Sequence, residues 1–233
     1  MMCLSKIGII LTPDSRSKAY LQKLLANDFV LDEIIFMNDK RESQDYTYDL
    51  IKQAKQNSFD ITTSVESTLK NNNLNYHEFN FVDINHKELI SYLKKSSIDF
   101  YIFTGGGILK TDILNSGVKF IHFHSGIVPL YRGSTTFYYS ILNEKKCGVT
   151  AYVMDEHLDT GEVIHQKSFS KPDHKFIDEI YDSHIRSETL IEVMKKGLIH
   201  NSEFKKQVPR GETYYIIHPV LKHIAMLNCL KDE

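Results

Sequence analysis

In this chain of 233 residues, the stretch KFIHFHSGIVPLYRG, residues 119–133, is the part that best indicates the fold and the site. Its first six residues are predicted to form a β-strand, in which His122 and His124 lie two residues apart and project from the same face. A Ser-Gly pair then ends the strand, so both histidines lie near its carboxyl end. Open α/β sheets bind ligands at that end of their parallel strands, which makes this stretch a candidate site.

Short apolar runs and helical patterns alternate on both sides of this stretch. The alternation is typical of β-α-β units, and it predicts a Rossmann-like α/β fold with a mostly parallel sheet flanked by helices. The strands are expected at 6–11, 31–37, 76–82, 99–104, 119–124, 148–154 and 163–169, and the helices at 19–25, 49–55, 65–69 and 86–95. Ser15 is the expected N-cap of the first helix.

The last part of the chain is predicted to be an appendage of the same domain. Residues 1–170 are expected to form the core, and residues 171–233 to add a helix and a short helical or hairpin segment packed against it. A long helix is predicted from Asp173 to about Lys196. The tail at 213–227 is too apolar to be solvated, so it is expected to pack back on the domain, and a homodimer is plausible.

Composition excludes several classes of protein. Hydrophobic residues make up 42% of the chain, which is enough for a sizeable core, and the net charge of −2 gives no basic surplus for binding nucleic acid. Cys3, Cys147 and Cys229 are few and far apart, which favours a reducing compartment over a disulfide framework. The chain shows no leader pattern and no apolar run of about 18 residues. A cytoplasmic protein without a membrane segment is expected.

Three features are candidates for chemistry. Gly105 to Gly107 follow a strand and allow a close approach of backbone to a ligand, although a flexible turn is the alternative, and Lys110 breaks the dinucleotide fingerprint. The two histidines of the central strand are candidate general bases, metal ligands or hydrogen-bonded core residues. Asp159 lies in a turn and becomes functional only if it meets His124, where a carboxylate is expected to raise the imidazole pKa.

In this order, the motifs resemble those of the folate-dependent formyltransferases. That family has a centre of the form Asn-x-His-Pro-Ser, then Leu-Pro and Arg-Gly, followed by an Asp-x-Gly loop and an apolar strand that ends in Gln. The matching residues here are Gly105–Leu109, His124, Ser125, Pro129, Arg132, Gly133, Gly148–Thr150, Asp159–Gly161, Val163, Ile164 and Gln166. Within the family, the chain resembles most the enzymes that formylate amino sugars carried on nucleotides.

The resemblance implies transfer of a formyl group from 10-formyltetrahydrofolate to an amine, without a metal. By this resemblance, the catalytic residues are His122, His124, Asp159 and the supporting hydroxyl of Thr150. The folate would be bound by Gly106, Gly107, Ile108, Leu109, Leu158 and Thr160, and the acceptor by Ser125, Tyr131, Arg132 and Gly133. A small acceptor is expected, with no nucleic acid or membrane partner.

The chain departs from the family pattern at two positions that matter. His122 stands where the family has Asn, and an imidazole N–H can replace the carboxamide as the donor to an oxyanion. No proline follows His124. The rival interpretations are a formyltetrahydrofolate hydrolase, a metal-dependent hydrolase that uses His122, His124 and Asp159 as ligands, and a catalytically silent binder of folate or a sugar nucleotide.

Subfamily features favour an amino-sugar acceptor. The methionyl-tRNA enzymes of the family add a C-terminal barrel, for which the chain after Gln166 is expected to be too short. The glycinamide ribonucleotide enzymes carry a glycine-rich phosphate loop after the first strand, and residues 11–17 here contain no glycine. The sugar N-formyltransferases have compact C-terminal appendages and less fixed N-terminal loops.

Overall fold

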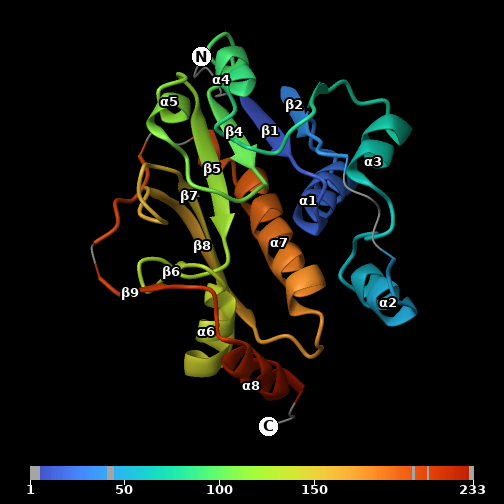
Figure 1. Cartoon of the computed structure of the whole chain (residues 1–233), viewed down its shortest axis with the longest axis vertical. Helices are drawn as coiled ribbons and strands as arrows, with labels where there is room; N and C mark the ends of the chain where they lie inside the picture. Colours follow the sequence, from blue (N-terminus) through green and yellow to red (C-terminus); the bar gives the residue numbers. More distant parts are fainter. Residues whose placement is uncertain (1–5, 41–44, 201–202, 209, 231–233) are drawn as a thin grey trace.

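A seven-stranded sheet forms the centre of the molecule, in the order β3-β2-β1-β4-β5-β7-β8 (Figure 1). The computed structural model describes residues 6–40, 45–200, 203–208 and 210–230. The strands are β1 (Ile7–Leu11), β2 (Glu33–Met37), β3 (His77–Phe79), β4 (Phe100–Phe103), β5 (Lys119–His124), β7 (Lys146–Val153) and β8 (Val163–Ser170). The first five pair in parallel, and β7 and β8 are antiparallel to their neighbours. The predicted mostly parallel α/β fold is confirmed.

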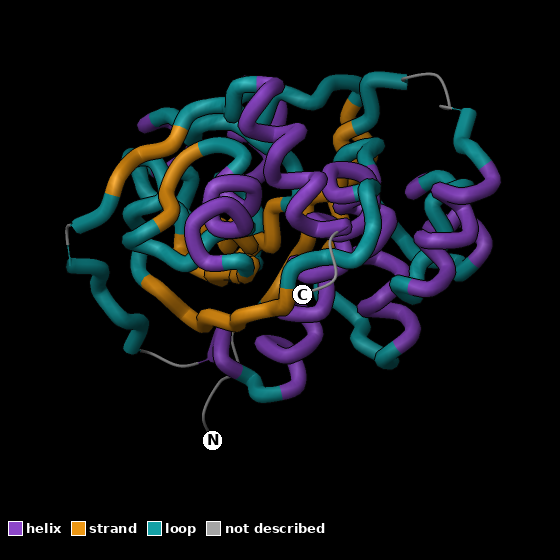
Figure 2. Tube along the Cα trace, turned by 90° about the horizontal axis from the view of Figure 1, so that it is seen from below, coloured by secondary structure: helices purple, strands orange, loops and turns teal. Residues whose placement is uncertain are grey.

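Helices cover both faces of this sheet because the strands bury side chains on both sides. Figure 2 shows helices on two sides of the strands. The helices before the C-terminal segment are α1 (Ser15–Ala26), α2 (Tyr48–Gln56), α3 (Val65–Asn71), α4 (Lys87–Leu93), α5 (Thr111–Leu114), α6 (Thr136–Glu144) and α7 (Asp182–Lys195). Ile121 and Phe123 of β5 pack in one cluster with α1, α3 and α7, whereas Phe120 packs in a second cluster with α4 and α5.

Helix α1 begins one turn after β1 and places a cation beside the sheet. It starts at Ser15, but its N-cap is Asp14, whose side chain accepts a hydrogen bond of 2.8 Å from the Ser17 N–H. The prediction of Ser15 as the cap is therefore wrong by one residue. This cap places Arg16 in the first turn, where its guanidinium donates to the carbonyl of Thr104 just after β4, at 2.9 Å.

The long helix predicted from Asp173 begins later than expected. The N–H of Phe176 donates to the ring Nδ1 of His174, so the chain is still a loop at this point. A π-helical turn at Ile177–Tyr181 comes next and leads directly into α7. The predicted end near Lys196 is confirmed, since α7 ends at Lys195.

The C-terminal segment returns to the core as a strand and a helix. Strand β9 (Glu212–Tyr214) pairs in parallel with β6 (Tyr131–Gly133) instead of forming a hairpin, and α8 (Pro219–Leu230) lies against α6. A short 3-10 helix at Leu198–His200 precedes them. The sequence did not predict β6, α6 or the short helix α5.

The prediction that the apolar tail packs on the domain holds for only part of it. Ile217, Ala225 and Cys229 are buried. Other apolar side chains of this segment are exposed, namely Tyr215, Ile216, Val220, Leu221, Ile224, Leu227 and Leu230. The described helices include none that is long and apolar enough to span a bilayer. Cys147 and Cys229 are unpaired thiols, and Cys3 lies outside the described residues.

We expect Gly161→Ala to destabilise the fold at the turn that carries Asp159. A Cβ at this position would lie 1.7 Å from the carbonyl oxygen of Val153, so the turn would have to shift. The free energy of unfolding should fall by about 1–3 kcal/mol, the usual cost of overpacking. Urea unfolding measures it. Gly106→Ala is the matched control, because nothing lies within 4 Å of its added Cβ; equal stability of the two variants would contradict this reading.

Candidate active site

The site lies where β5 loses one of its two neighbours. Pairing between β4 and β5 ends at Ile102 and Ile121, whereas β5 and β7 stay paired up to His124 and Thr150. His122 and His124, on the same face of β5 beyond Ile121, therefore face an opening at the carboxyl end of the parallel strands. A pocket of about 560 Å³ occupies it. Its wall includes Gly105–Leu109, His122, His124, Ser125, Gly133–Phe137, Tyr152, Asp155, His157–Asp159, Asp182, Arg186 and Tyr214–Ile216.

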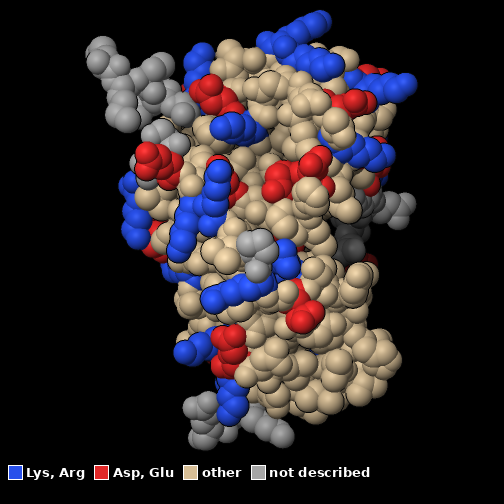
Figure 3. Space-filling view, turned by 90° about the vertical axis from the view of Figure 1, so that its left-hand side faces the viewer, with Lys and Arg blue, Asp and Glu red and all other residues tan. Residues whose placement is uncertain are grey.

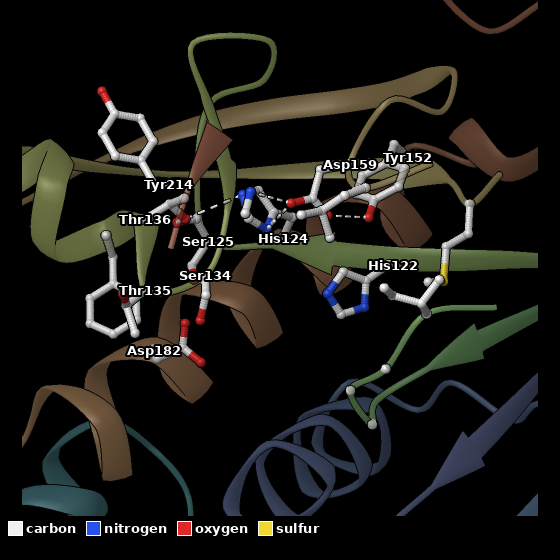
Figure 4. A pocket seen from close by; sticks show the side chains of 18 of the residues that line it. His122, His124, Ser125, Ser134, Thr135, Thr136, Tyr152, Asp159, Asp182 and Tyr214 are labelled. Carbon is white, nitrogen blue, oxygen red and sulfur yellow. Dashed lines mark hydrogen bonds and ion pairs between the residues drawn. The ribbon is translucent and has the colours of Figure 1, made fainter. Parts of the chain in front are cut away.

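The ring of His124 is held through one nitrogen. Its Nε2 lies 2.9 Å from the carbonyl oxygen of Tyr131. The same nitrogen lies 3.2 Å from Oγ1 of Thr136 (Figure 4). Thr136 donates its own hydroxyl proton to the Ser125 carbonyl at 2.6 Å, so both neighbours of Nε2 are acceptors. We therefore assign the proton of the neutral ring to Nε2, which leaves a free lone pair on Nδ1.

Asp159 lies beside that free nitrogen. Its Oδ2 is 3.6 Å from Nδ1 of His124, which is too long for a direct hydrogen bond but close enough for a strong attraction when the ring is protonated. Oδ2 accepts from the N–H of Gly133 at 2.6 Å, and Oδ1 accepts from the hydroxyl of Tyr152 at 2.7 Å. Asp159 has a φ of 54°, so the turn holds it in the left-handed region.

Burial decides the charge state of His124. The expectation that Asp159 raises its pKa is wrong as a net effect, because burial lowers the pKa more than the carboxylate raises it, and the positive charge of Arg186 lowers it further. The pKa of His124 therefore lies below its ordinary value, and the ring is a neutral base at pH 7. Burial, followed by the charge of Asp159, raises the pKa of Tyr152 well above its ordinary value, so this hydroxyl stays a donor.

His122 lies between the end of β4 and helix α7. Its Nδ1 is 3.4 Å from the carbonyl oxygen of Phe103, and its Nε2 is 3.4 Å from a guanidinium nitrogen of Arg186. Burial lowers the pKa of His122 well below its ordinary value, and the charges of Arg186 and Arg16 lower it further. This imidazole is neutral at physiological pH.

A charge network in the wall of the pocket was not predicted from the sequence. Asp182 accepts from Nε of Arg186 at 2.7 Å and pairs with Arg16 at 3.6 Å. Burial alone would raise the pKa of Asp182, but the two guanidinium groups outweigh it and lower the pKa. The spacing of Asp182 and Arg186 in a helix was a possible signal, yet the same i,i+4 spacing is common in exposed ion pairs.

The structure brings most of the predicted site residues to one pocket. Ten of them line it with their side chains or backbone: His122, His124, Asp159, Gly106, Gly107, Ile108, Leu109, Leu158, Ser125 and Gly133. Gly105, from the same glycine run, also lines it. Four others are not part of the wall: Thr150, Thr160, Tyr131 and Arg132.

Three of the residues outside the wall, Thr150, Thr160 and Tyr131, make contacts that support segments next to the pocket. Thr150 donates to the carbonyl of Gly126 at 2.7 Å, and so holds the loop after β5. The hydroxyl of Thr160 donates to Asp155 at 2.8 Å. Tyr131 supplies the carbonyl that fixes His124, and its ring stacks on Tyr214.

The C-terminal segment closes one side of the pocket. The N–H of Ser134 donates to the carbonyl of Tyr214 at 2.8 Å, and the N–H of Ile217 donates to Oγ1 of Thr135 at 2.9 Å. Tyr215 and Ile216 lie between these bonds, line the pocket and are 80% and 79% exposed. Part of the wall therefore comes from residues about 80 positions away in the chain.

A metal site is not formed by these groups. Within the part of the chain that the structure describes, no three His, Cys, Asp or Glu side chains lie close enough to hold a metal ion. The interpretation of His122, His124 and Asp159 as three metal ligands therefore has no geometric support: Nε2 of His122 faces a guanidinium, and Nε2 of His124 faces two acceptors.

Fold and site together define an α/β protein of Rossmann-like topology. Its pocket lies at the carboxyl ends of the parallel strands and contains a buried histidine–aspartate pair. The sequence model of formyl transferases matches residues 35–193, and the chain belongs to this family.

Comparisons with individual proteins agree with the family but name different acceptors. The chain is 34% identical over 134 residues to the methionyl-tRNA formyltransferase of Clostridium tetani, an alignment that covers 55% of this chain and 43% of that protein. The first curated relatives are matched over only 33–48% of their own length.

Solved structures of similar fold include sugar N-formyltransferases. One is WlaRD, a sugar 3N-formyl transferase solved in the presence of dTDP and 5-N-formyl-THF, with a TM-score of 0.63 and 19% identity over 97% of this chain and 79% of that one. Another is the N-formyltransferase from Helicobacter canadensis in complex with folinic acid and dTDP-3-aminofucose, with a TM-score of 0.62 and 16% identity over 97% and 81% of the two chains. At these identities the likeness concerns the fold.

We expect the stability of the protein to fall as the pH drops below the ordinary histidine range, in part because of His122. Its pKa is lowered in the folded state, so below about pH 6.5 the unfolded chain binds a proton that the folded chain does not. Stability is thus present above this pH and is lost toward pH 5.5. His122→Asn should reduce the difference in unfolding free energy between pH 7.5 and 5.5 by about 1 kcal/mol.

Urea unfolding at the two pH values measures this difference. His157→Asn serves as the control, since the His157 side chain is 71% exposed and loses little hydration on folding. An unchanged pH dependence in His122→Asn would show that this ring titrates alike in both states.

Proposed function

We propose that this protein transfers a formyl group from 10-formyltetrahydrofolate to the amine of a nucleotide-linked amino sugar. One observation carries the proposal: in a pocket of suitable size, Nδ1 of His124 has a lone pair available to accept a proton and lies 3.6 Å from the buried carboxylate of Asp159. A neutral base beside a fixed negative charge can accept a proton and be stabilised once it has done so.

Different residues of the pocket have different roles in the proposed transfer. Nδ1 of His124 takes a proton from the attacking amine, and Asp159 stabilises the imidazolium that results. Tyr152 and the Gly133 N–H hold Asp159 in place, so its charge is oriented before the reaction. The N–H of His122 is the donor for the negative charge that develops on the formyl oxygen. When the tetrahedral intermediate collapses, the bond between the formyl carbon and the folate nitrogen breaks, and His124 returns its proton to that leaving nitrogen.

The pocket suits a folate donor. Its volume of about 560 Å³ falls within the range of small-molecule sites. Gly105–Leu109 provide a wall of backbone and apolar side chains along one part, and the 155–159 turn provides another. Two structural neighbours were solved with reduced folates, which supports the same donor here. The folate supplies an activated formyl group. The residues of this chain bind and orient the folate and the acceptor, and they move the proton.

The acceptor is inferred from the other side of the pocket. Tyr215 and Ile216 present exposed apolar surface at its mouth, which suits the planar or apolar parts of a sugar nucleotide better than the highly charged backbone of a tRNA. The net charge of −2 also argues against a tRNA acceptor, which is the acceptor that the names of the curated relatives give. A cytoplasmic location, where both folate and sugar nucleotides occur, belongs to the same proposal.

His124→Ala and Asp159→Asn should each reduce formyl transfer strongly. Loss of the base is expected to lower kcat by about 100- to 10,000-fold, and loss of the charge beside it by about 100-fold. Release of tetrahydrofolate, followed spectroscopically, measures the rate, and circular dichroism verifies the fold. Lys52→Ala, at an exposed position of α2, is the control. Rates within a few-fold of the native enzyme in either site variant would contradict the assigned roles.

A panel of acceptors distinguishes the proposal from its rivals. Purified protein is incubated with 10-formyltetrahydrofolate and with dTDP- or UDP-linked amino sugars, glycinamide ribonucleotide or methionyl-tRNA, and the products are identified by mass spectrometry. We expect a formylated amino-sugar nucleotide. Tetrahydrofolate released without any formylated product would identify a hydrolase, and formylated methionyl-tRNA would replace the proposed acceptor.

We also propose that a second copy of the chain covers the apolar face of α8. This face consists of Val220, Leu221, Ile224 and Leu227, which are 42–59% exposed, and a broad area without charged side chains is visible at the same end of the molecule (Figure 3). Apolar surface of this kind typically marks an interface. Light scattering should show a dimer for the native protein and a monomer for Ile224→Glu, whereas Val30→Glu, at an exposed apolar residue between α1 and β2, should remain dimeric.

A further inference from the structure

Arg186 belongs to the site although no motif points to it. Its side chain is only 8% exposed, and it reaches from α7 to the end of β5. We infer that Arg186 is a positioning residue, whose guanidinium holds the imidazole of His122 in the tautomer with the proton on Nδ1. The catalytic consequence of this inference rests on the proposed function, whereas the tautomer itself does not.

The guanidinium is fixed by four groups at once. Its Nε donates to Asp182 at 2.7 Å and its Nη2 to the hydroxyl of Ser125 at 2.7 Å. Its Nη1 donates to the carbonyl of Phe123 and also faces Nε2 of His122, at 3.4 Å. A planar group held along three edges has one orientation, so the direction of Nη1 toward the ring is set by the fold.

The two neighbours of the His122 ring require the same tautomer. A guanidinium has only donors, so Nε2 of His122 must accept and carries no proton. The other ring nitrogen, Nδ1, lies 3.4 Å from the carbonyl of Phe103, which is only an acceptor. The neutral ring therefore carries its proton on Nδ1, as assigned from this network. The nearby charges of Arg186 and Arg16, after burial, keep the pKa of His122 low, so a second proton is disfavoured.

This tautomer puts a donor where the proposed reaction needs one. Phe103 is the last residue of β4, and the glycine run that follows lines the pocket, so the Nδ1–H lies at the edge of the proposed folate wall. A contact of 3.4 Å is at the weak end of hydrogen bonds, and a developing negative charge can replace the Phe103 carbonyl as the acceptor. In the other tautomer, Nδ1 would present a lone pair to that charge and repel it.

A nuclear magnetic resonance experiment tests the tautomer without any substrate. In protein labelled with ¹⁵N-histidine, long-range proton–nitrogen correlations distinguish Nδ1–H from Nε2–H rings, and His122→Asn identifies the signals of His122. We expect an Nδ1–H ring in the native protein, and Nε2–H or a mixture in Arg186→Met. Arg16→Met, which removes the other cation on Asp182 without a contact to the ring, should keep Nδ1–H.

Either of two results would overturn the inference: an Nε2–H ring in the native protein, or an unchanged Nδ1–H ring after the loss of Arg186. Because Arg186→Met leaves Asp182 partly unpaired in a buried place, the variant can lose stability. Asp182→Asn combined with Arg186→Met removes both charges, and the same change of tautomer is expected in it.

Kinetics then separate positioning from a merely structural role. Arg186→Met should lower kcat by about 10- to 100-fold, the loss typical when the partner that orients a metal-bound imidazole is removed, with little change in KM. In a His122→Asn background the same substitution should cost much less, because a carboxamide always carries N–H donors. An equal loss in both backgrounds would mean that Arg186 acts only on the fold. If the spectra change as expected but no amine is formylated, the proposed function fails and the tautomer stands.

Discussion

The rest of the site depends on the hydrogen bonds that hold the carboxylate of Asp159 in place. Its two oxygens join three segments, because one accepts from the backbone of Gly133 in β6 and the other from Tyr152 in β7, while the residue itself lies in the turn before β8. The positive φ of Asp159 would be unfavourable in isolation, and these two bonds offset it. Its charge faces His124 only as long as all three segments are in place.

A group of buried charges forms part of the pocket wall. Two guanidinium groups and one carboxylate lie at the junction of α1, α7 and β5. Burying them costs free energy, and a packed apolar cluster would be at least as stable. The arrangement has an electrostatic effect on the two histidines, since burial lowers the pKa of both rings and the charge of Arg186 lowers it further. We interpret this network as part of the site rather than as a stabilising feature of the core.

The sequence predicted what is encoded locally. Strand β5 appears at the predicted residues because its pattern of apolar side chains specifies both its extent and the common face of His122 and His124. Other features depend on contacts between distant residues. Nothing near Arg186 reveals that α7 carries it to β5, and the burial that lowers the pKa of His124 comes from the whole fold. The start of α7 was misplaced because a favourable capping residue does not prevent a loop and a π-helical turn from coming first.

The pairing of β6 with β9 has a consequence for how the protein is made. A Cβ on Gly133 would lie 2.0 Å from the carbonyl oxygen of Tyr214, so the two backbones approach as closely as a glycine permits. Their residues are about 80 positions apart, and contacts over such a separation form late because of the loop that must be closed. On the ribosome, the sheet can assemble while the pocket still lacks one wall. The nascent chain therefore acquires a complete site only after Ile216 has left the exit tunnel.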